Sequence, residues 1–195
     1  MAVIKTNDLT QPLFVVSDDL ERAAKDLRAR DDSYSRRNYV RVLFAAIELT
    51  IYIQKQTILA AAADSSGQLT HPELMMLRGE TYDIGSDGEL LKRTKRIPMA
   101  DNSIFTQRCV EKGFGLSLSS HTTGPSWDDF KNAIKLRNRI THPKGHKDFD
   151  VSKDEAELAL RVGDWFVAFI GDWFGQFIKT AKPVYDIDAA SQFPI

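Results

Sequence analysis

The sequence has very little cysteine: Cys109 is the single thiol among 195 residues. One cysteine cannot form an internal disulfide, and it supplies too few thiolates for a cysteine-based zinc or iron–sulfur site. We interpret Cys109 as a small, partly buried apolar residue rather than a nucleophile. A P-loop, a GxGxxG motif and a GxSxG motif are also absent, so the sequence offers no sign of those nucleotide-binding or hydrolase classes.

Net charge and long apolar runs are lacking as well. The 26 basic and 27 acidic residues give a formal charge of -1, so any nucleic-acid binding must come from local clusters of Lys and Arg. The first residues have no basic segment followed by a long apolar core, and no later stretch offers 18 uncharged apolar residues. We therefore predict a cytoplasmic protein that does not enter a membrane.

The length fits a single domain over residues 1–195. We expect residues 1–16 to form an extended N-terminal arm, because Ser17 and Asp18 resemble a helix cap followed by an acidic first turn. The segment from Tyr34 to Ala63 has no Gly or Pro and carries apolar residues at helical spacing, which predicts a long, largely buried helix.

Residues 64–124 are dense in turn-forming residues, and we expect a less regular middle insertion with two short helices, at Thr70–Gly79 and Ser103–Lys112. No alternating pattern is sustained long enough there, or elsewhere, to demand a sheet. The fold class predicted is all-α, a helical bundle with two long core helices and additional short helices.

Two capping-box patterns predict where the last two helices begin. Ser126 opens SWDD, and this helix should stop near Thr141 because Pro143 restricts the residue before it. Ser152 opens SKDE and a long closing helix, with residues 183–195 as a tail. Its aromatic residues fit the core, with Trp165 or Trp173 as candidates for a dimer contact.

A row of side chains on the Ser126 helix changes character along its length. Phe130 and Ile134 are apolar, whereas Asn138 and His142 follow on the same i, i+4 row. Arg137 lies about 100° around the helix from Asn138, and its long side chain can reach toward His142. A core face therefore becomes a polar site near the helix end.

An imidazole beside a guanidinium suits RNA cleavage without metal. A neutral His can take the proton of a ribose 2′-hydroxyl or supply one to the leaving oxygen, and Arg can stabilise the phosphorane. Additional positive charge for RNA comes from residues around the same helix end: Arg139, Lys144, His146 and Lys147. A metal site at His142 and His146 is disfavoured because Pro143 and Gly145 interrupt the helix between them.

The segment LRNRITHPKG, between an amphipathic helix and a long closing helix, resembles the RNxxxH segment of HEPN domains, a helical-bundle superfamily rich in RNases. The resemblance implies a HEPN-like bundle and a metal-independent endoribonuclease without a cofactor, leaving a cyclic phosphate. It also implies a homodimer in which two motifs form one composite site. By this analogy Arg137 and His142 are catalytic and Asn138 is supporting.

The same resemblance suggests a toxin or phage-defence effector controlled by an antitoxin or another regulatory protein. An alternative is a catalytically inactive HEPN module that binds or dimerises with a partner protein or binds a nucleotide. A third reading, a helical scaffold without a polar site, predicts that Asn138 and His142 are buried and fully paired.

Three further features have two readings each. Glu48 lies in an apolar stretch, where it either pairs with Arg137 or His142 and holds the site, or lies on a solvent-facing strip with Arg41 and Lys55. The basic runs that include Arg36 and Arg37, and residues 92–96, either follow an RNA backbone or are solvated surface.

Overall fold

The computed structural model describes residues 6–64 and 68–185. Within these residues the chain forms α-helices, two short 3-10 helices and one β-hairpin, in the order α1 (Thr6–Arg30), α2 (Ser33–Asp64), α3 (His71–Leu77), β1 (Glu80–Ile84), β2 (Leu90–Thr94), α4 (Met99–Phe114), η1 (Ser119–Thr122), α5 (Gly124–Thr141), η2 (His146–Phe149) and α6 (Lys153–Tyr185). The predicted all-α class is confirmed.

Helix α2 is the central element. Its residues Val40, Leu43, Phe44 and Ile47 are almost fully buried, at the spacing of one helical face. The helix packs against α1, α4, α5 and α6. It is also, among the described helices, the one long and apolar enough to cross a bilayer by length and composition, but half of its most apolar window is buried inside the bundle.

Helix α1 corrects the prediction of an extended arm over residues 1–16. The helix already begins at Thr6, and residues 1–5 lie outside the described part. Leu13, Leu20 and Leu27 are buried at seven-residue intervals against the bundle. This packing of α1 along α2 compensates for Pro12, which lies inside the helix and removes one backbone donor.

The middle region is more regular than predicted. Helix α3 has the expected cap, with Glu73 accepting a hydrogen bond from the backbone N–H of Thr70 at 2.6 Å. Helix α4 is longer than the expected Ser103–Lys112 and contributes Cys109 and Val110 to the core. Region 64–124 therefore supplies a full bundle helix.

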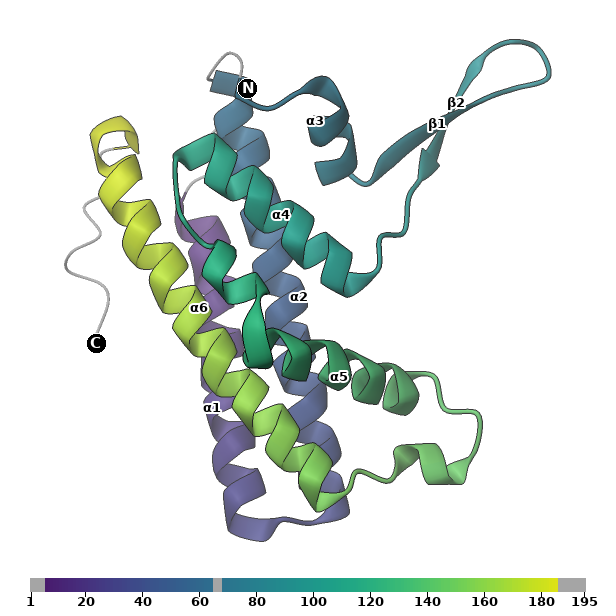
Figure 1. The fold of residues 1–195 in the computed structure, drawn as a ribbon, viewed down its shortest axis with the longest axis vertical. Helices are drawn as coiled ribbons and strands as arrows, with labels where there is room; N and C mark the ends of the chain where they lie inside the picture. The colour runs from purple at the N-terminus through teal and green to yellow at the C-terminus, as the bar shows by residue number, and fades with distance from the viewer. Residues whose placement is uncertain (1–5, 65–67, 186–195) are drawn as a thin grey trace.

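The hairpin of β1 and β2 was not predicted. It is antiparallel, with Tyr82 opposite Lys92 and Ile84 opposite Leu90, and it projects away from the helices (Figure 1). Its strands are only five residues long and almost wholly exposed. Strands so short give too little alternation to detect in a sequence.

Helix α5 starts two residues before Ser126, because Thr123 is its N-cap and Pro125 lies in its first turn. Its predicted end at Thr141 is confirmed. The capping box of α6 is also confirmed, with Ser152 and Glu155 exchanging hydrogen bonds of 2.9 and 3.2 Å. Since α6 continues to Tyr185, residues 183–185 are helical and not tail; residues 186–195 lie outside the described part.

An aromatic cluster fixes the first half of α5 between α2 and α6. The Phe130 ring lies 6.3 Å from that of Phe44 and 5.1 Å from that of Trp165, and Trp165 stacks on Phe169. Trp173 is 2% exposed and belongs to the core. With its beginning held in this way, α5 runs outward from the bundle and its last turns project to the right in Figure 1.

Candidate functional site

The two faces of α5 differ sharply. Ala133, Leu136 and Ile140 are buried against the bundle. On the predicted row, Phe130 is fully buried and Ile134 is partly buried, whereas Asn138 and His142 are exposed. The exposure of Asn138 and His142 is the opposite of what a scaffold without a polar site requires.

Arg137 is held by two neighbours. Its Nη2 donates to the carboxylate of Glu48 on α2, and its Nη1 donates to Oδ1 of Asn138 at 3.1 Å. The Arg137 side chain is 24% exposed and that of Glu48 is 46% exposed. The guanidinium is therefore largely covered but still reachable, and its remaining N–H groups are free to bind an anion.

Glu48 makes the contact that its first reading requires and has the exposure that its second reading requires. Glu48 pairs with Arg137, as the first reading requires, and it also lies on a strip of α2 that bears the exposed Arg41 and the half-buried Lys55. Tyr52, which is 55% exposed, belongs to the same strip.

His142 lies at the C-terminal cap of α5. Its backbone N–H donates to the carbonyl of Asn138 at 3.0 Å, which keeps the residue one helical turn beyond Asn138. The imidazole is exposed, and within the described residues it makes no hydrogen bond or ion pair. Both ring nitrogens are thus available for proton transfer.

Three arginines form hydrogen bonds with the backbone of the segment that follows His142. Arg37, Arg139 and Arg36 donate to the carbonyls of three successive residues, Phe149 (3.2 Å), Asp150 (2.8 Å) and Val151 (3.2 Å).

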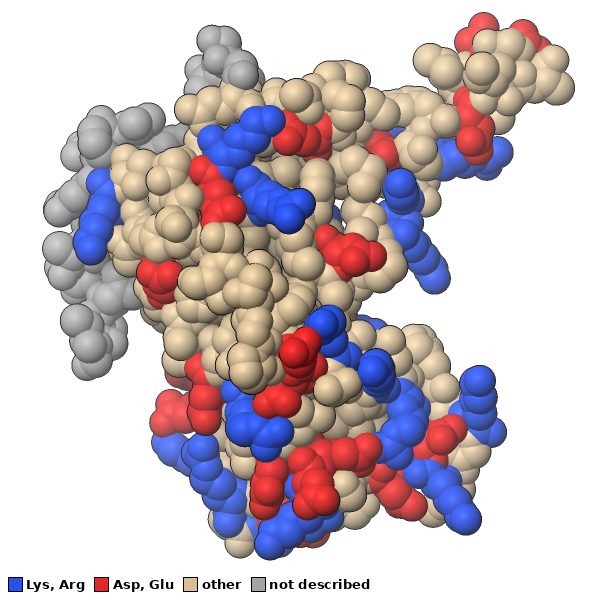
Figure 2. Space-filling model, viewed as in Figure 1, with Lys and Arg blue, Asp and Glu red and all other residues tan. Residues whose placement is uncertain are grey.

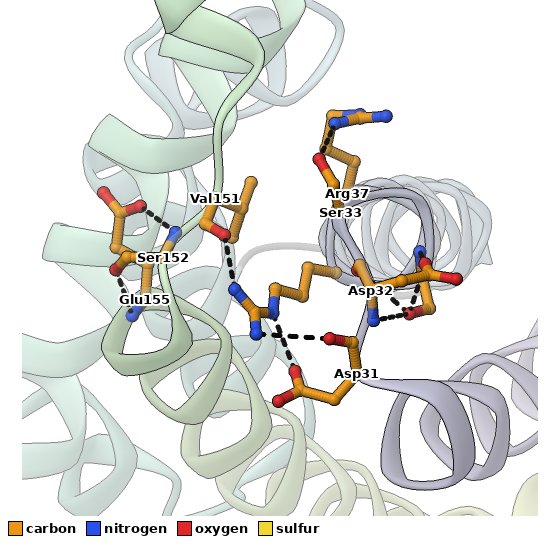
Figure 3. Close-up of polar contacts among 9 residues, drawn as sticks. Asp31, Asp32, Ser33, Arg37, Val151, Ser152 and Glu155 are labelled. Carbon is orange, nitrogen blue, oxygen red and sulfur yellow. Dashed lines mark hydrogen bonds and ion pairs between the residues drawn. The ribbon is translucent and has the colours of Figure 1, made fainter.

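Two of these arginines also bind carboxylates. Arg36 also binds the carboxylate of Asp31 at 2.7 Å, and Arg139 binds that of Glu155 at 2.7 Å. Figure 3 shows how the start of α2 and the start of α6 meet across this loop. These three cations, predicted as RNA contacts, are engaged in holding the chain.

Lys144 and Lys147, also predicted as RNA contacts, are exposed and form no ion pair with the described residues. Their loop is ordered by Asp148, whose carboxylate accepts the backbone N–H groups of Lys144 and Gly145 at 2.6 and 3.1 Å. Both ammonium groups therefore face solvent beside the end of α5.

A groove lies between α2, the beginning of α4 and the exposed face of α5, with a volume of about 730 Å³; we call it the α2–α5 groove. Its lining includes Glu48, Tyr52 and Lys55 from α2, residues 97–100 and Asn102 around the start of α4, and Lys131, Ile134, Lys135, Arg137 and Asn138 from α5. In Figure 2 the surface is notched at the right between the α4 and α5 parts, with Lys and Arg side chains bordering the notch.

The sequence did not single out Tyr52, Lys131 or Lys135. The two lysines share the i, i+4 spacing of one helical face, so the signal was present on α5. Tyr52 gave no such signal, because its place opposite α5 follows from how α2 and α5 pack.

The basic run at residues 92–96 is divided in the structure. Lys92 and Arg93 pair with Glu80 and Asp83 across the hairpin, at 2.6 and 3.2 Å. Lys95 and Arg96 are exposed and directly precede the residues that line the groove.

A second histidine has a structural partner. Nε2 of His121 lies 3.0 Å from Oδ2 of Asp172, and the imidazole packs edge-on against Phe169. Hydrogen bonds from Gln176 and then His121 hold the pKa of Asp172 below its usual range. This pair ties η1 to α6.

The described residues contain no group of three or more His, Cys, Asp and Glu side chains that could hold a metal ion. Fold and site together define an all-α bundle in which a partly covered Arg137 and the exposed Asn138 and His142 lie at the end of α5, beside a cationic groove. Comparisons with protein-family models, with characterised proteins and with solved structures found no match.

Proposed function

We propose that the protein is a metal-independent endoribonuclease of the HEPN type, cleaving RNA at a site built from Arg137, Asn138 and His142. The observation that carries the proposal is that an oriented, partly covered guanidinium and an exposed imidazole lie five positions apart at the end of the same helix. The RNxxxH resemblance supplies the reaction class.

In the proposed reaction the 2′-oxygen of a ribose attacks the adjacent phosphorus, and its proton passes to an imidazole. The bond from phosphorus to the 5′-oxygen of the next nucleotide breaks, giving a 2′,3′-cyclic phosphate and a 5′-hydroxyl that has taken up a proton. His142 acts in this proton transfer, since its ring nitrogens are unpaired in the described structure.

Arg137 is proposed to bind the phosphate and its developing negative charge. Glu48 and Asn138 use one donor each of the guanidinium, so the group is oriented while other N–H donors stay free. Glu48 is a positioning residue in this scheme, because it acts through Arg137.

One imidazole cannot at once accept the proton of the nucleophile and protonate the leaving oxygen. A homodimer that brings two copies of the exposed α5 end together would supply the second imidazole, as the resemblance implies. We further propose that such an activity belongs to a toxin or phage-defence effector, with an antitoxin or other regulatory protein covering this end of α5.

The test is incubation of the purified protein with total RNA in EDTA, followed by analysis of fragments and their termini. We expect the wild type to cut and leave cyclic phosphates, and Arg137→Ala and His142→Ala to lose at least about a hundredfold in rate. His71→Ala is the matched control, because His71 is exposed at the start of α3, outside the proposed site.

Equal cleavage by His142→Ala and His71→Ala would refute the assignment of His142. Failure of the folded wild type to cut any of several RNA classes would refute the nuclease and leave the binding or dimerisation module as the better reading.

A further inference from the structure

The α2–α5 groove has a composition that suits a polyanion with flat bases. Of the charged residues that line it, Lys55, Lys131, Lys135 and Arg137 are basic and Glu48 is acidic. Because Glu48 is already paired with Arg137, the lysines give the groove a net positive charge.

The lysines differ in whether a carboxylate already neutralises their charge. Lys131 pairs with Asp128 at 2.7 Å, and Lys135 donates only to the neutral amide of Asn132 at 3.1 Å. Lys55 is half-buried and makes no ion pair within the described residues, and its burial lowers its pKa. A cation withdrawn from water without a counter-charge favours the binding of an anion.

Tyr52 provides a flat surface in the same groove. Its side chain is 55% exposed although it projects from the central helix of the fold. It lies one helical turn from Glu48 and less than one turn from Lys55, so an aromatic face and a cation adjoin. Aromatic side chains next to basic ones are the usual means of binding single-stranded nucleic acid, whose bases are free to stack.

The size of the groove also fits a single nucleotide unit. The volume of about 730 Å³ is in the range of about 300–1,000 Å³ typical of pockets for small-molecule ligands and cofactors.

The groove also leads toward His142. Lys131, Lys135, Asn138 and His142 follow one another along one side of α5, over 11 residues or about 16 Å of helix. A strand lying along this side would meet the lysines first and the Arg137–His142 end afterwards.

We infer that the α2–α5 groove binds a nucleotide unit of single-stranded RNA, with the base on Tyr52 and the phosphates on Lys55 and Lys135. That the strand is RNA and continues into a cleavage site rests on the proposed function. The binding itself is independent of cleavage, and the two can fail separately.

The experiment measures fluorescence anisotropy of a labelled 12-nucleotide single-stranded RNA, in EDTA, at several salt concentrations. The background is His142→Ala, so that cleavage does not consume the probe, and circular dichroism confirms that each variant is folded. Tyr52→Ala is expected to weaken binding at least about fivefold, whereas Tyr52→Phe keeps the ring and stays within about twofold.

Lys135→Ala is expected to lower the slope of log K against log salt by about 0.7, the value for one phosphate contact on a single strand. Tyr34→Ala and Lys179→Ala are the matched controls. Tyr34 is 64% exposed on the same helix but outside the groove, and Lys179 is exposed on α6. Both should leave affinity and slope unchanged.

Absence of RNA binding, or equal losses for Tyr52→Ala and Tyr34→Ala, would overturn the inference. So would equal affinity for the same RNA as a duplex, or competition by mononucleotides at the concentrations at which the strand binds. Binding that depends on Tyr52 without cleavage by the wild type would uphold the groove and refute the nuclease; cleavage unaffected by Tyr52→Ala would do the reverse.

Discussion

Gly163 and Tyr39 offer a test of how α6 packs on α2. Gly163 lies in the interior of α6, and a Cβ atom there would lie 2.1 Å from the hydroxyl oxygen of Tyr39. Tyr39 is only 3% exposed, so its ring has little room to move. The next contact, with Cζ of the same ring at 3.4 Å, is an ordinary one.

Gly163→Ala should therefore destabilise the protein by about 2 kcal/mol, within the range for overpacking a core. For a chain of this size that lowers the Tm by about 4–8 °C. In a Tyr39→Phe background the clashing oxygen is gone, and the same substitution should stabilise by up to about 1 kcal/mol, since Ala is the better helix former. The effect of Gly163→Ala on the free energy of unfolding therefore has opposite signs in the two backgrounds.

The assay is thermal and urea unfolding of four proteins, wild type, both single variants and the double variant, followed by circular dichroism. Tyr39→Phe alone should shift the Tm little. If Gly163→Ala had the same effect in both backgrounds, the close approach of α6 to α2 at this position would be wrong.

Three further predictions concern other parts of the chain. The Lys112 ammonium and the Thr70 backbone lower the pKa of Glu73 from 4.5 to about 2, so its carboxylate stabilises the fold above pH 4.5. The Tm difference between wild type and Glu73→Gln should thus shrink as pH falls from 4.5 toward 2; a constant difference would refute the pairing. Burial raises the pKa of the Cys109 thiol to about 11, so iodoacetamide at pH 8 should label it slowly in the native protein and rapidly in urea, by mass spectrometry. Arg139→Ala should lower the free energy of unfolding by about 1–2 kcal/mol and speed hydrogen exchange in residues 142–152. Unchanged exchange would contradict the role of Arg139 in holding this loop.

Local patterns in the sequence predicted the helices well where a cap or a stop is encoded in neighbouring residues. Thr70 with Glu73 and Ser152 with Glu155 form the expected caps, and α5 ends at Thr141 before Pro143. Such signals depend on residues three or four positions apart, so no knowledge of the fold is needed to read them.

The errors have tertiary causes. The arm predicted over residues 1–16 is helical from Thr6 because Leu13 packs against the bundle, and α4 extends beyond Ser103–Lys112 because α2 lies beneath it. The sequence did not predict the hairpin, because short exposed strands leave no strong pattern of alternation.

The sequence by itself determined that α5 turns from apolar to polar along one row and that Arg137, Asn138 and His142 lie at its end, because a helix repeats every 3.6 residues whatever surrounds it. Only the tertiary structure decided that Glu48, 89 positions earlier in the chain, holds Arg137, and that Tyr52 faces the lysines of α5. Those contacts depend on how the aromatic cluster sets α5 against α2, and the crossing of two helices is fixed by the packing of their buried side chains, which no short stretch of sequence contains.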